Sequence, residues 1–384
     1  MKSVAPLPAY PAYPGGAGFA GEAALSGLDW ALAGVAAVLL VVALIYLFAR
    51  GRSSADSRIG LALGVRGLLA KELRSRSRGW RPIWLLSGYL ALLTLSVVGL
   101  LGLMGMAGGI VSPAVGTQLF SALGTGAVLL LAFITPALTV GAVSGERERR
   151  TLDLLLVTRA SPLGLAGGKL AGSLAYVLFL LAASLPAFAL VYLFGGVPAI
   201  YVVMVLAVAA VTALAHASLG LLLSALLRRT IVASVVAYLL VLFLVFGLPF
   251  VSAVAGVARQ QAQQGGPQAP GVPPVYLYAS PMASVSSVLP AGSPGMGFPL
   301  IGDLTRILMM GGSYGYGTPT PASPDIAHAV YVVAVDRTTG QPRMVTQLAP
   351  WVYHFTFSGL LALFCLGGTA LLLAPANPWR RAPK

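Results

Sequence analysis

Long uncharged hydrophobic runs dominate this chain and predict helices that cross a membrane. A run of about 20 apolar residues is long enough to span a hydrocarbon core of roughly 30 Å as a helix. The first such run extends from Trp30 to Ala49, and no charged residue occurs between Pro82 and Gly145. The second run is too long for one span, so breaks within it must be found.

Glycine and proline divide the longest runs. A break at 108–113 gives two spans between 82 and 145, and a break at 195–198 gives two spans within 170–227. Two further spans are predicted at about 231–254 and 352–373. The pattern therefore predicts an all-α polytopic integral membrane protein with seven transmembrane helices.

The composition agrees with this class. Of the 384 residues, 58% are hydrophobic and 9% are charged, whereas a soluble domain is about 25% charged. The single cysteine, Cys365, excludes an internal disulfide framework and a cysteine-rich metal site. Residues 1–29 are rich in proline, glycine and alanine and lack the early hydrophobic stretch of a secretory signal, so we expect a flexible segment outside the membrane.

Lysine and arginine predict the orientation. If the N-terminus lies outside, the inner segments hold 19 of the 24 basic residues: nine at 50–81, five at 147–169, two at 228–229 and three at 380–384. The short outer loops hold none, which is the positive-inside pattern and puts the C-terminal tail, 376–384, in the cytoplasm. Anionic lipid headgroups of the cell membrane attract such an inner face, so the formal charge of +14 requires no nucleic acid.

A long outer loop, residues 256–350, precedes the last span. It opens with the low-complexity tract QQAQQGGPQAPGVPP, which predicts a flexible chain. Further on, VYVVAVDRTTGQPRMVTQ contains two β-prone runs around a Thr-Gly turn and predicts a small β-hairpin. Between them, GFPLIGDLTRILMMGG predicts a short helix at the outer interface.

The predicted spans contain no Asp, Glu, Lys or Arg, the groups that ion-coupled transporters usually need at membrane depth. Only His216 and His354 could titrate there near neutral pH, and we expect each to be hydrogen-bonded to a neighbouring helix. If the protein moves a substrate, its energy must come from a partner.

The inner segment SGERERRTLDLLLVTRASPLGLAGGKLAG, residues 144–172, carries five consecutive charges. It is not a Walker A phosphate loop, because Leu163 stands where that loop needs its first glycine and Leu170 where it needs serine or threonine. Instead Gly164, Gly168 and Gly172 recur every four residues, which predicts a flat helix face for close packing.

The charged part predicts an amphipathic cytoplasmic helix from Glu146 to about Thr158. Ser161 and Pro162 then begin the next span as its N-cap and first helical residue. The apolar side of the predicted helix, which needs cover from lipid or from a partner, consists of Leu152, Leu155 and Leu156.

This segment resembles the signature of ABC type-2 (ABC-2) permeases, the transmembrane subunits of ATP-binding-cassette exporters. That family has a Glu-Arg-Glu run at the end of its second span, then Gly-Thr-Leu-Glu-Leu-Leu-Leu, a Thr-Pro or Ser-Pro, and a Gly-Lys that opens its third span. Arg150 stands at the usual glycine and Asp153 at the usual glutamate. The matching residues are Glu146, Glu148, Thr151, Leu152, Asp153, Leu154, Leu155, Ser161, Pro162, Gly168 and Lys169.

A second feature resembles the same family. The basic segment 50–81 contains a stretch with helical apolar spacing and a Lys-Glu-Leu sequence, which is similar to the interfacial elbow helix of these permeases. The residues of this predicted elbow helix are Leu61, Val65, Leu68, Leu69, Lys71 and Glu72.

The resemblance covers roughly residues 58–375. It implies a six-helix permease bundle, with a five-span core at 82–255 and a last transmembrane helix at 351–375, to which the span at 30–49 adds an extra N-terminal helix. It also implies that 146–158 is a coupling helix that docks on a separate ATP-binding subunit. The implied docking residues are Glu146, Arg147, Glu148, Arg149, Thr151, Leu152, Asp153, Leu155 and Leu156.

The resemblance further implies export, a second permease copy or paralogue, contact with membrane lipids, and ATP and Mg bound by the partner rather than by this chain. No catalytic residue, metal ligand or cofactor site is assigned to the chain itself. Two alternatives stay open: a membrane scaffold or assembly factor without transport, and an intramembrane lipid enzyme that uses His216 or His354. The cargo could be lipid-like, drug-like, a peptide or a glycan.

Overall fold

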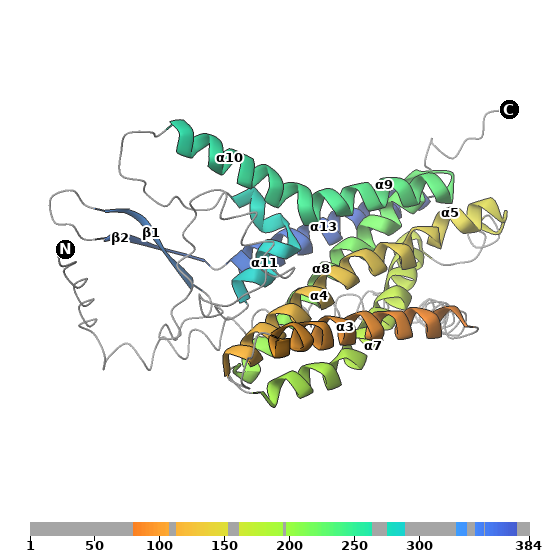
Figure 1. Ribbon diagram of the computed structural model, residues 1–384. Helices are drawn as coiled ribbons and strands as arrows, with labels where there is room; N and C mark the ends of the chain where they lie inside the picture. Colours follow the sequence, from red (N-terminus) through yellow and green to blue (C-terminus); the bar gives the residue numbers. More distant parts are fainter. Residues whose placement is uncertain are drawn as a thin grey trace, which may run out of the picture.

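The computed structural model describes residues 80–106, 113–152, 161–194, 197–262, 275–288, 328–335, 342–348 and 350–374. Within these ranges, six helices are long and apolar enough to cross a membrane (Figure 1). They confirm the last six predicted spans and the all-α polytopic class. The predicted span at 30–49, the elbow helix and the short helix of the outer loop lie outside the described residues.

The spanning segments and the shorter elements between them follow in chain order. The six spanning segments are Pro82–Gly102, Val115–Glu148, Pro162–Tyr192, Ala199–Leu226, Thr230–Ala255 and Trp351–Leu373. The elements are α3 (Arg81–Met106), α4 (Pro113–Thr139), α5 (Gly141–Glu148), α7 (Pro162–Tyr192), α8 (Ala199–Leu226), α9 (Thr230–Leu242), the π-helix η1 (Phe243–Gly247), α10 (Leu248–Ala262), the 3-10 helix η2 (Val275–Ala279), α11 (Pro281–Val288), β1 (His328–Val335), β2 (Pro342–Leu348) and α13 (Pro350–Leu373).

The start of α7 follows the predicted chemistry. Ser161 has an extended backbone, its Oγ accepts a hydrogen bond of 3.0 Å from the Gly164 amide, and Pro162 is the first helical residue. The serine thereby satisfies one of the amide groups that the first turn of a helix leaves unpaired.

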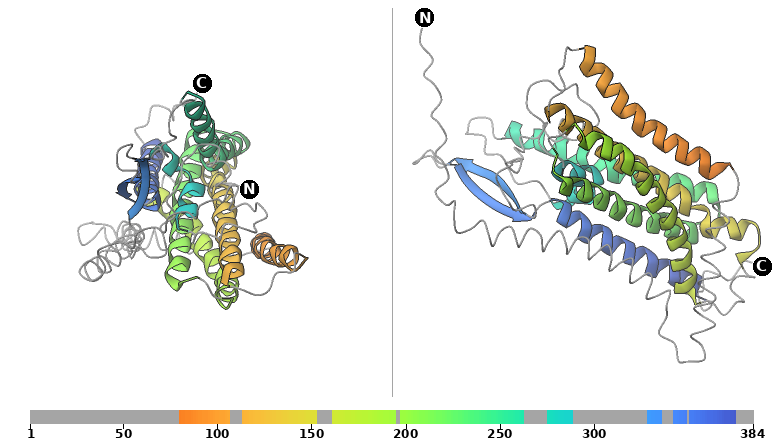
Figure 2. Two further views of the ribbon diagram at one scale, coloured as in Figure 1. Left: turned by 60° about the vertical axis from the view of Figure 1, so that its left-hand side comes forward. Right: turned by 90° about the horizontal axis from the view of Figure 1, so that it is seen from below.

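Helix α8 forms the centre of the bundle and contacts α4, α7, α9, α11 and α13. In its most hydrophobic stretch 56% of the residues are buried, against 22% in the spans of α3 and of α9–α10, which lie at the margin (Figure 2). Helix α8 lies very close to α4 at Gly220, where an added Cβ would meet the Thr139 hydroxyl and the Pro136 backbone. A side chain at this glycine would therefore push the two helices apart.

Part of the long outer loop folds back into the bundle. Helix α11 is largely buried and contacts α4, α8 and α13, with η2 lying beside α13. Ser280 donates a hydrogen bond of 3.2 Å to the Val245 carbonyl within the π-helix η1, where the wider winding changes the regular helical pairing.

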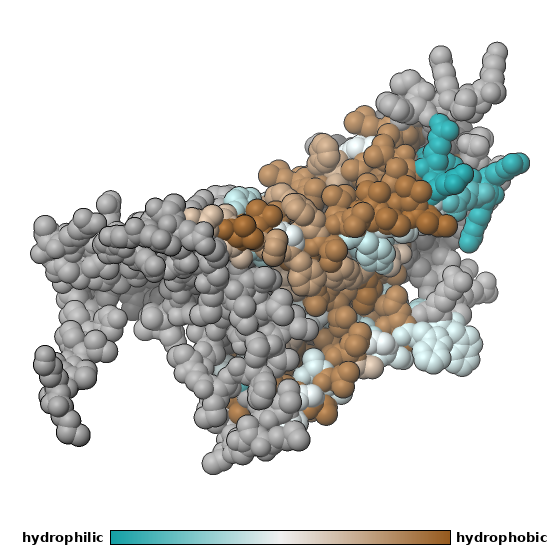
Figure 3. Space-filling view, turned by 45° about the horizontal axis from the view of Figure 1, so that its top comes forward, coloured by the Kyte–Doolittle hydropathy of each residue, from teal (hydrophilic) through white to brown (hydrophobic). Residues whose placement is uncertain are grey.

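The predicted β-hairpin is confirmed. Strands β1 and β2 pair antiparallel, with an irregularity between Val332 and Ala334, and they lie at the opposite end of the bundle from α5 (Figure 1). The surface of the helices between these ends is mainly hydrophobic, and hydrophilic side chains gather where α5 ends (Figure 3).

Candidate functional site at the charged end of the bundle

Helix α5 ends at Glu148, and the chain then turns in a C-terminal cap of the kind that glycine usually forms. In this chain an arginine, Arg150, occupies the glycine position. Arg150 has a φ of 58°, in the left-handed region, and it follows the cap residue Arg149. The Thr151 amide donates to the Glu146 carbonyl over 2.9 Å, and the Arg150 amide donates to the Arg147 carbonyl over 3.0 Å. These two bonds form a Schellman motif, in which the left-handed position usually holds glycine.

This cap overturns the predicted continuous helix from Glu146 to Thr158. Glu146 and Glu148 belong to the end of the preceding spanning segment, and helical winding resumes at Leu152. Residues 153–160, including Asp153, Leu155 and Leu156, lie outside the described residues. The family signature that the segment resembles has glycine where this chain has Arg150, and a left-handed residue ends an α-helix, so that resemblance was the available signal of the break.

An ion pair joins this end of α5 to α7. Lys169 Nζ lies 2.7 Å from Glu146 Oε1, and the two side chains are 2% and 19% exposed. Lys169 is about two turns into α7, and Glu146, Arg147 and Glu148 end the preceding spanning segment. The expectation that the spans contain no charged residue is therefore wrong at both places. The uncharged run begins only at Leu170, whereas Ser161 and Pro162 start the helix earlier, as predicted. Lys169 can be buried within it because its charge is paired.

Arg147 and Glu148, which follow Glu146 in the chain, bind the ends of two further helices. Arg147 donates to the Ala225 carbonyl over 3.1 Å and to the Leu227 carbonyl over 3.4 Å, at the C-terminal end of α8. Glu148 Oε1 accepts a hydrogen bond of 2.7 Å from the Thr230 amide, the first residue of α9. Helix ends carry partial charges, negative at the C-terminus and positive at the N-terminus, so each side chain meets the opposite sign.

A layer of hydroxyl groups lies deeper between α5, α8 and α9. Ser224 Oγ accepts hydrogen bonds of 2.9 Å from the amides of both Val143 and Ser144, near the start of α5. The hydroxyls of Ser144 and Thr230 are 2.9 Å apart. Ser224 thus satisfies amides that the break between α4 and α5 frees from intrahelical bonding.

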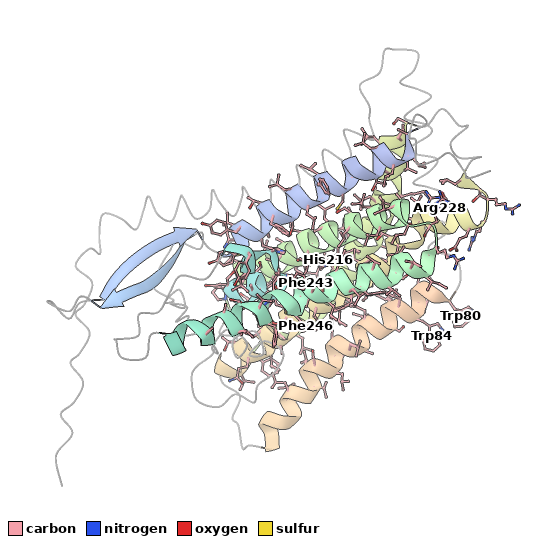
Figure 4. The ribbon with its side chains drawn as sticks, turned by 90° about the horizontal axis from the view of Figure 1, so that it is seen from above. Trp80, Trp84, His216, Arg228, Phe243 and Phe246 are labelled. Atoms are coloured by element: carbon pink, nitrogen blue, oxygen red, sulfur yellow. The ribbon has the colours of Figure 1, made fainter. Side chains whose placement is uncertain are left out.

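Some of the docking residues predicted from the sequence point into the bundle, and others are exposed. Glu146 and Arg147 reach into the bundle, and Leu152 is buried in a cluster with Val143 and Leu165. Glu148, Arg149 and Thr151 are exposed, as is Arg150. Arg228 and two exposed tryptophans, Trp80 and Trp84, lie at the same end of the bundle (Figure 4).

The predicted glycine face of α7 is mostly enclosed. Gly168 and Gly172 are buried, and Gly164 is half-buried. Among the neighbours of α7 are α4, α8 and α13, which is the environment that a face of small residues suits.

The two membrane histidines are buried at the interface of α8 and α13. His354 shares hydrogen bonds with the Thr212 hydroxyl over 3.0 Å and with the Tyr278 carbonyl over 3.1 Å, as expected for a histidine bonded to neighbouring segments. His216 lies inside the bundle (Figure 4), beside the Ala132 backbone, and its Nδ1 has no hydrogen-bond partner within the described ranges. Among the residues that the structure describes, no group of three or more His, Cys, Asp or Glu side chains is arranged to hold a metal ion.

These features define a multi-pass helical membrane protein with a cluster of charged residues where α5 ends. The family model described as "ABC-2 family transporter protein" matches residues 111–374, more than two thirds of the chain, and the chain belongs to this family. It is therefore a membrane transport component, and family membership implies partnership with an ATP-binding subunit. A search of curated proteins found no match.

Proposed function

We propose that this chain is the permease subunit of an ATP-driven exporter, and that a separate ATP-binding subunit docks at the turn of Glu148, Arg149, Arg150 and Thr151. The observation that carries the proposal is the position of this turn. It is exposed and charged, and it follows directly on a spanning helix that side-chain contacts join to α7, α8 and α9. A force applied to the turn would reach the bundle without passing through a flexible linker.

The docking role of the acidic residues is narrower than the sequence suggested. Glu146 is paired inside the bundle, so it acts on docking only through the position of α5. A Glu146→Lys substitution would place a second cation against Lys169 and would test folding rather than docking. Arg149 and Arg150 are the better probes because both are exposed.

A second permease copy or paralogue would complete the transport path. Support comes from α3 and the span of α9, η1 and α10, the least buried spanning segments, which expose many large apolar side chains such as Trp84, Leu95, Leu239 and Phe243. In this proposal part of that surface faces the second permease and the rest faces lipid. The substrate would cross between the two permeases as ATP binding and hydrolysis move them.

The test is purification of the tagged full-length chain from the cells that produce it. We expect an ATP-hydrolysing subunit to be retained, and its hydrolysis rate to change when the permease is present. The double substitution Arg149→Glu/Arg150→Glu should weaken retention, whereas Arg228→Glu, an exposed arginine at the same end, should not. A wild-type chain that retains no such subunit would refute the proposed function.

Orientation needs a separate measurement. Cys365 is the only cysteine and is buried, so Arg149→Cys in a Cys365→Ser background provides one exposed thiol. We propose that this turn lies in the cytoplasm, in agreement with the positive-inside pattern. Labelling of intact cells by a membrane-impermeant maleimide would contradict this orientation.

A further inference from the structure

We propose that the last turn of α5 is a clamp that makes α5, α7, α8 and α9 move as one body when the exposed turn is displaced. The α5 clamp consists of Glu146, Arg147 and Glu148, bound respectively to Lys169, to the C-terminal carbonyls of α8 and to the Thr230 amide. The inference rests on the proposed function, because it concerns how a force from the ATP-binding subunit enters the bundle. It assigns these three residues a positioning role.

Because the three side chains of the α5 clamp point in different directions, their partners lie on more than one neighbouring helix. Successive residues of an α-helix are separated by about 100° around its axis, so three in a row cover roughly 200°. Each of the three nevertheless finds its partner on a different helix: α7, α8 and α9. The end of α5 is therefore attached both to α7 and to the connection between α8 and α9, and it cannot shift away from either without breaking a contact.

The signs of the charges match the helix ends that they meet. Helix α8 ends and α9 begins within the short stretch 226–230, so a negative and a positive helix end lie side by side. Arg147 binds the negative C-terminal end of α8, and Glu148 binds the positive N-terminal end of α9. This adjacent pair thus binds both sides of the α8–α9 connection and couples it to α5.

The hydroxyl layer reinforces the same attachment. Ser224 of α8 accepts from two α5 amides, and Ser144 of α5 is bonded to Thr230 of α9. Among the described contacts, α3 packs on α4 and α7 and takes part in none of these bonds. The clamp therefore selects some of the spanning helices rather than holding all of them.

Stability alone is a weak reason for this arrangement. A buried ion pair often contributes no more than a well-packed apolar pair of the same volume, because both charges lose their hydration. The ion pair nevertheless fixes which helices pack together, since any arrangement that separates the two side chains leaves a buried charge without its counter-charge. Specific positioning of four helices relative to the exposed turn is what the clamp provides beyond packing.

Charge exchange tests the inference in the complete transporter, with ATP hydrolysis as the readout. Lys169→Glu should reduce the change in ATP hydrolysis rate that the permease causes in the ATP-binding subunit about fivefold or more. The subunit should still be retained, because the exposed turn is intact. The double exchange Glu146→Lys/Lys169→Glu should restore the effect. Arg228→Gln at the same end serves as the matched control and should behave as wild type.

A second pair of variants covers the case in which Lys169→Glu fails to fold. Glu148 is exposed, so its substitution leaves the core intact. Glu148→Gln keeps an acceptor for the Thr230 amide and should retain part of the effect. Glu148→Ala should lose the effect while the ATP-binding subunit is still retained, which distinguishes a broken clamp from lost docking. A disulfide between Glu148→Cys and Thr230→Cys, in the Cys365→Ser background, should leave the effect intact because the clamp stays closed.

The outcomes separate the two proposals. If the wild-type permease neither retains nor affects an ATP-binding subunit, the proposed function fails and the clamp inference fails with it. If the wild type responds and Glu148→Ala responds equally, only the clamp inference is overturned. Loss of the response in the disulfide-locked protein would also overturn it, because the clamp would then have to open.

Discussion

Removal of the Lys169 charge should destabilise the bundle, because it leaves Glu146 facing a buried site without its cation. In Lys169→Met the aliphatic part of the side chain is retained and the ion pair of 2.7 Å is lost. Breaking a buried pair by removing one partner costs about 3–5 kcal/mol. Glu146 is 19% exposed and can gain some hydration, so we expect the lower end of this range.

The pair is best measured as a double-mutant cycle. Glu146→Gln should also be destabilising, because Lys169 is more deeply buried than its partner. The double variant Glu146→Gln/Lys169→Met removes both charges and should be more stable than Lys169→Met alone. Contacting charges of this kind typically show coupling energies of about 0.5–3 kcal/mol.

Thermal unfolding of the purified chain in detergent provides the assay, followed by tryptophan fluorescence. A loss of about 3 kcal/mol should lower the unfolding temperature by roughly 4 °C in a protein of this size, because the entropy of unfolding grows with chain length. Arg149→Met, which removes an exposed cation from the neighbouring turn, should change stability by less than about 0.5 kcal/mol. Strictly additive effects of the two single substitutions would refute the argument, because they would mean that the two charges do not interact.

Three further variants, the first with a matched control, test other contacts by the same unfolding measurement. Gly220→Ala should cost about 1–3 kcal/mol by forcing α8 from α4, whereas Gly99→Ala, with no atom near the added Cβ, should cause no loss. Arg150→Gly should stabilise the chain by up to about 1 kcal/mol, since glycine adopts the left-handed backbone without strain. Exchanging Arg147 and Glu148 preserves composition and net charge but places each charge against a helix end of the same sign. The exchange should cost about 1–3 kcal/mol of stability. An unchanged unfolding temperature would contradict the assigned contacts.

The six described spans could be predicted because each buries or exposes an uninterrupted apolar surface, which is a property of local sequence. The start of α7 could be predicted for a similar reason, since Ser161 and Pro162 satisfy the requirements of a helix N-terminus by themselves. The β-hairpin likewise follows from two local β-prone runs and a turn. These elements depend little on what packs against them.

The interior position of Lys169 could not be predicted in this way. Its partner is 23 residues away in the chain, on another helix, and only tertiary structure brings the two charges together. The buried placement of α11 has the same origin, because its short sequence is compatible with an exposed loop and its neighbours α4, α8 and α13 are distant in sequence. Reading spans from uncharged runs fails where a charge finds its partner inside the bundle.

The five consecutive charges that begin at Glu146 can be understood from helix geometry. A surface that docks on one partner needs charges on one face, at spacings of three or four residues. Consecutive charges instead point to all sides of a helix, which is suited to a helix end that is surrounded by other helices. The first three charges of the run meet α7, α8 and α9 in turn, and the last two follow the end of α5 and are exposed. The run therefore combines two tasks in chain order: attachment of the helix end to the bundle, and presentation of an exposed cationic turn directly beyond it.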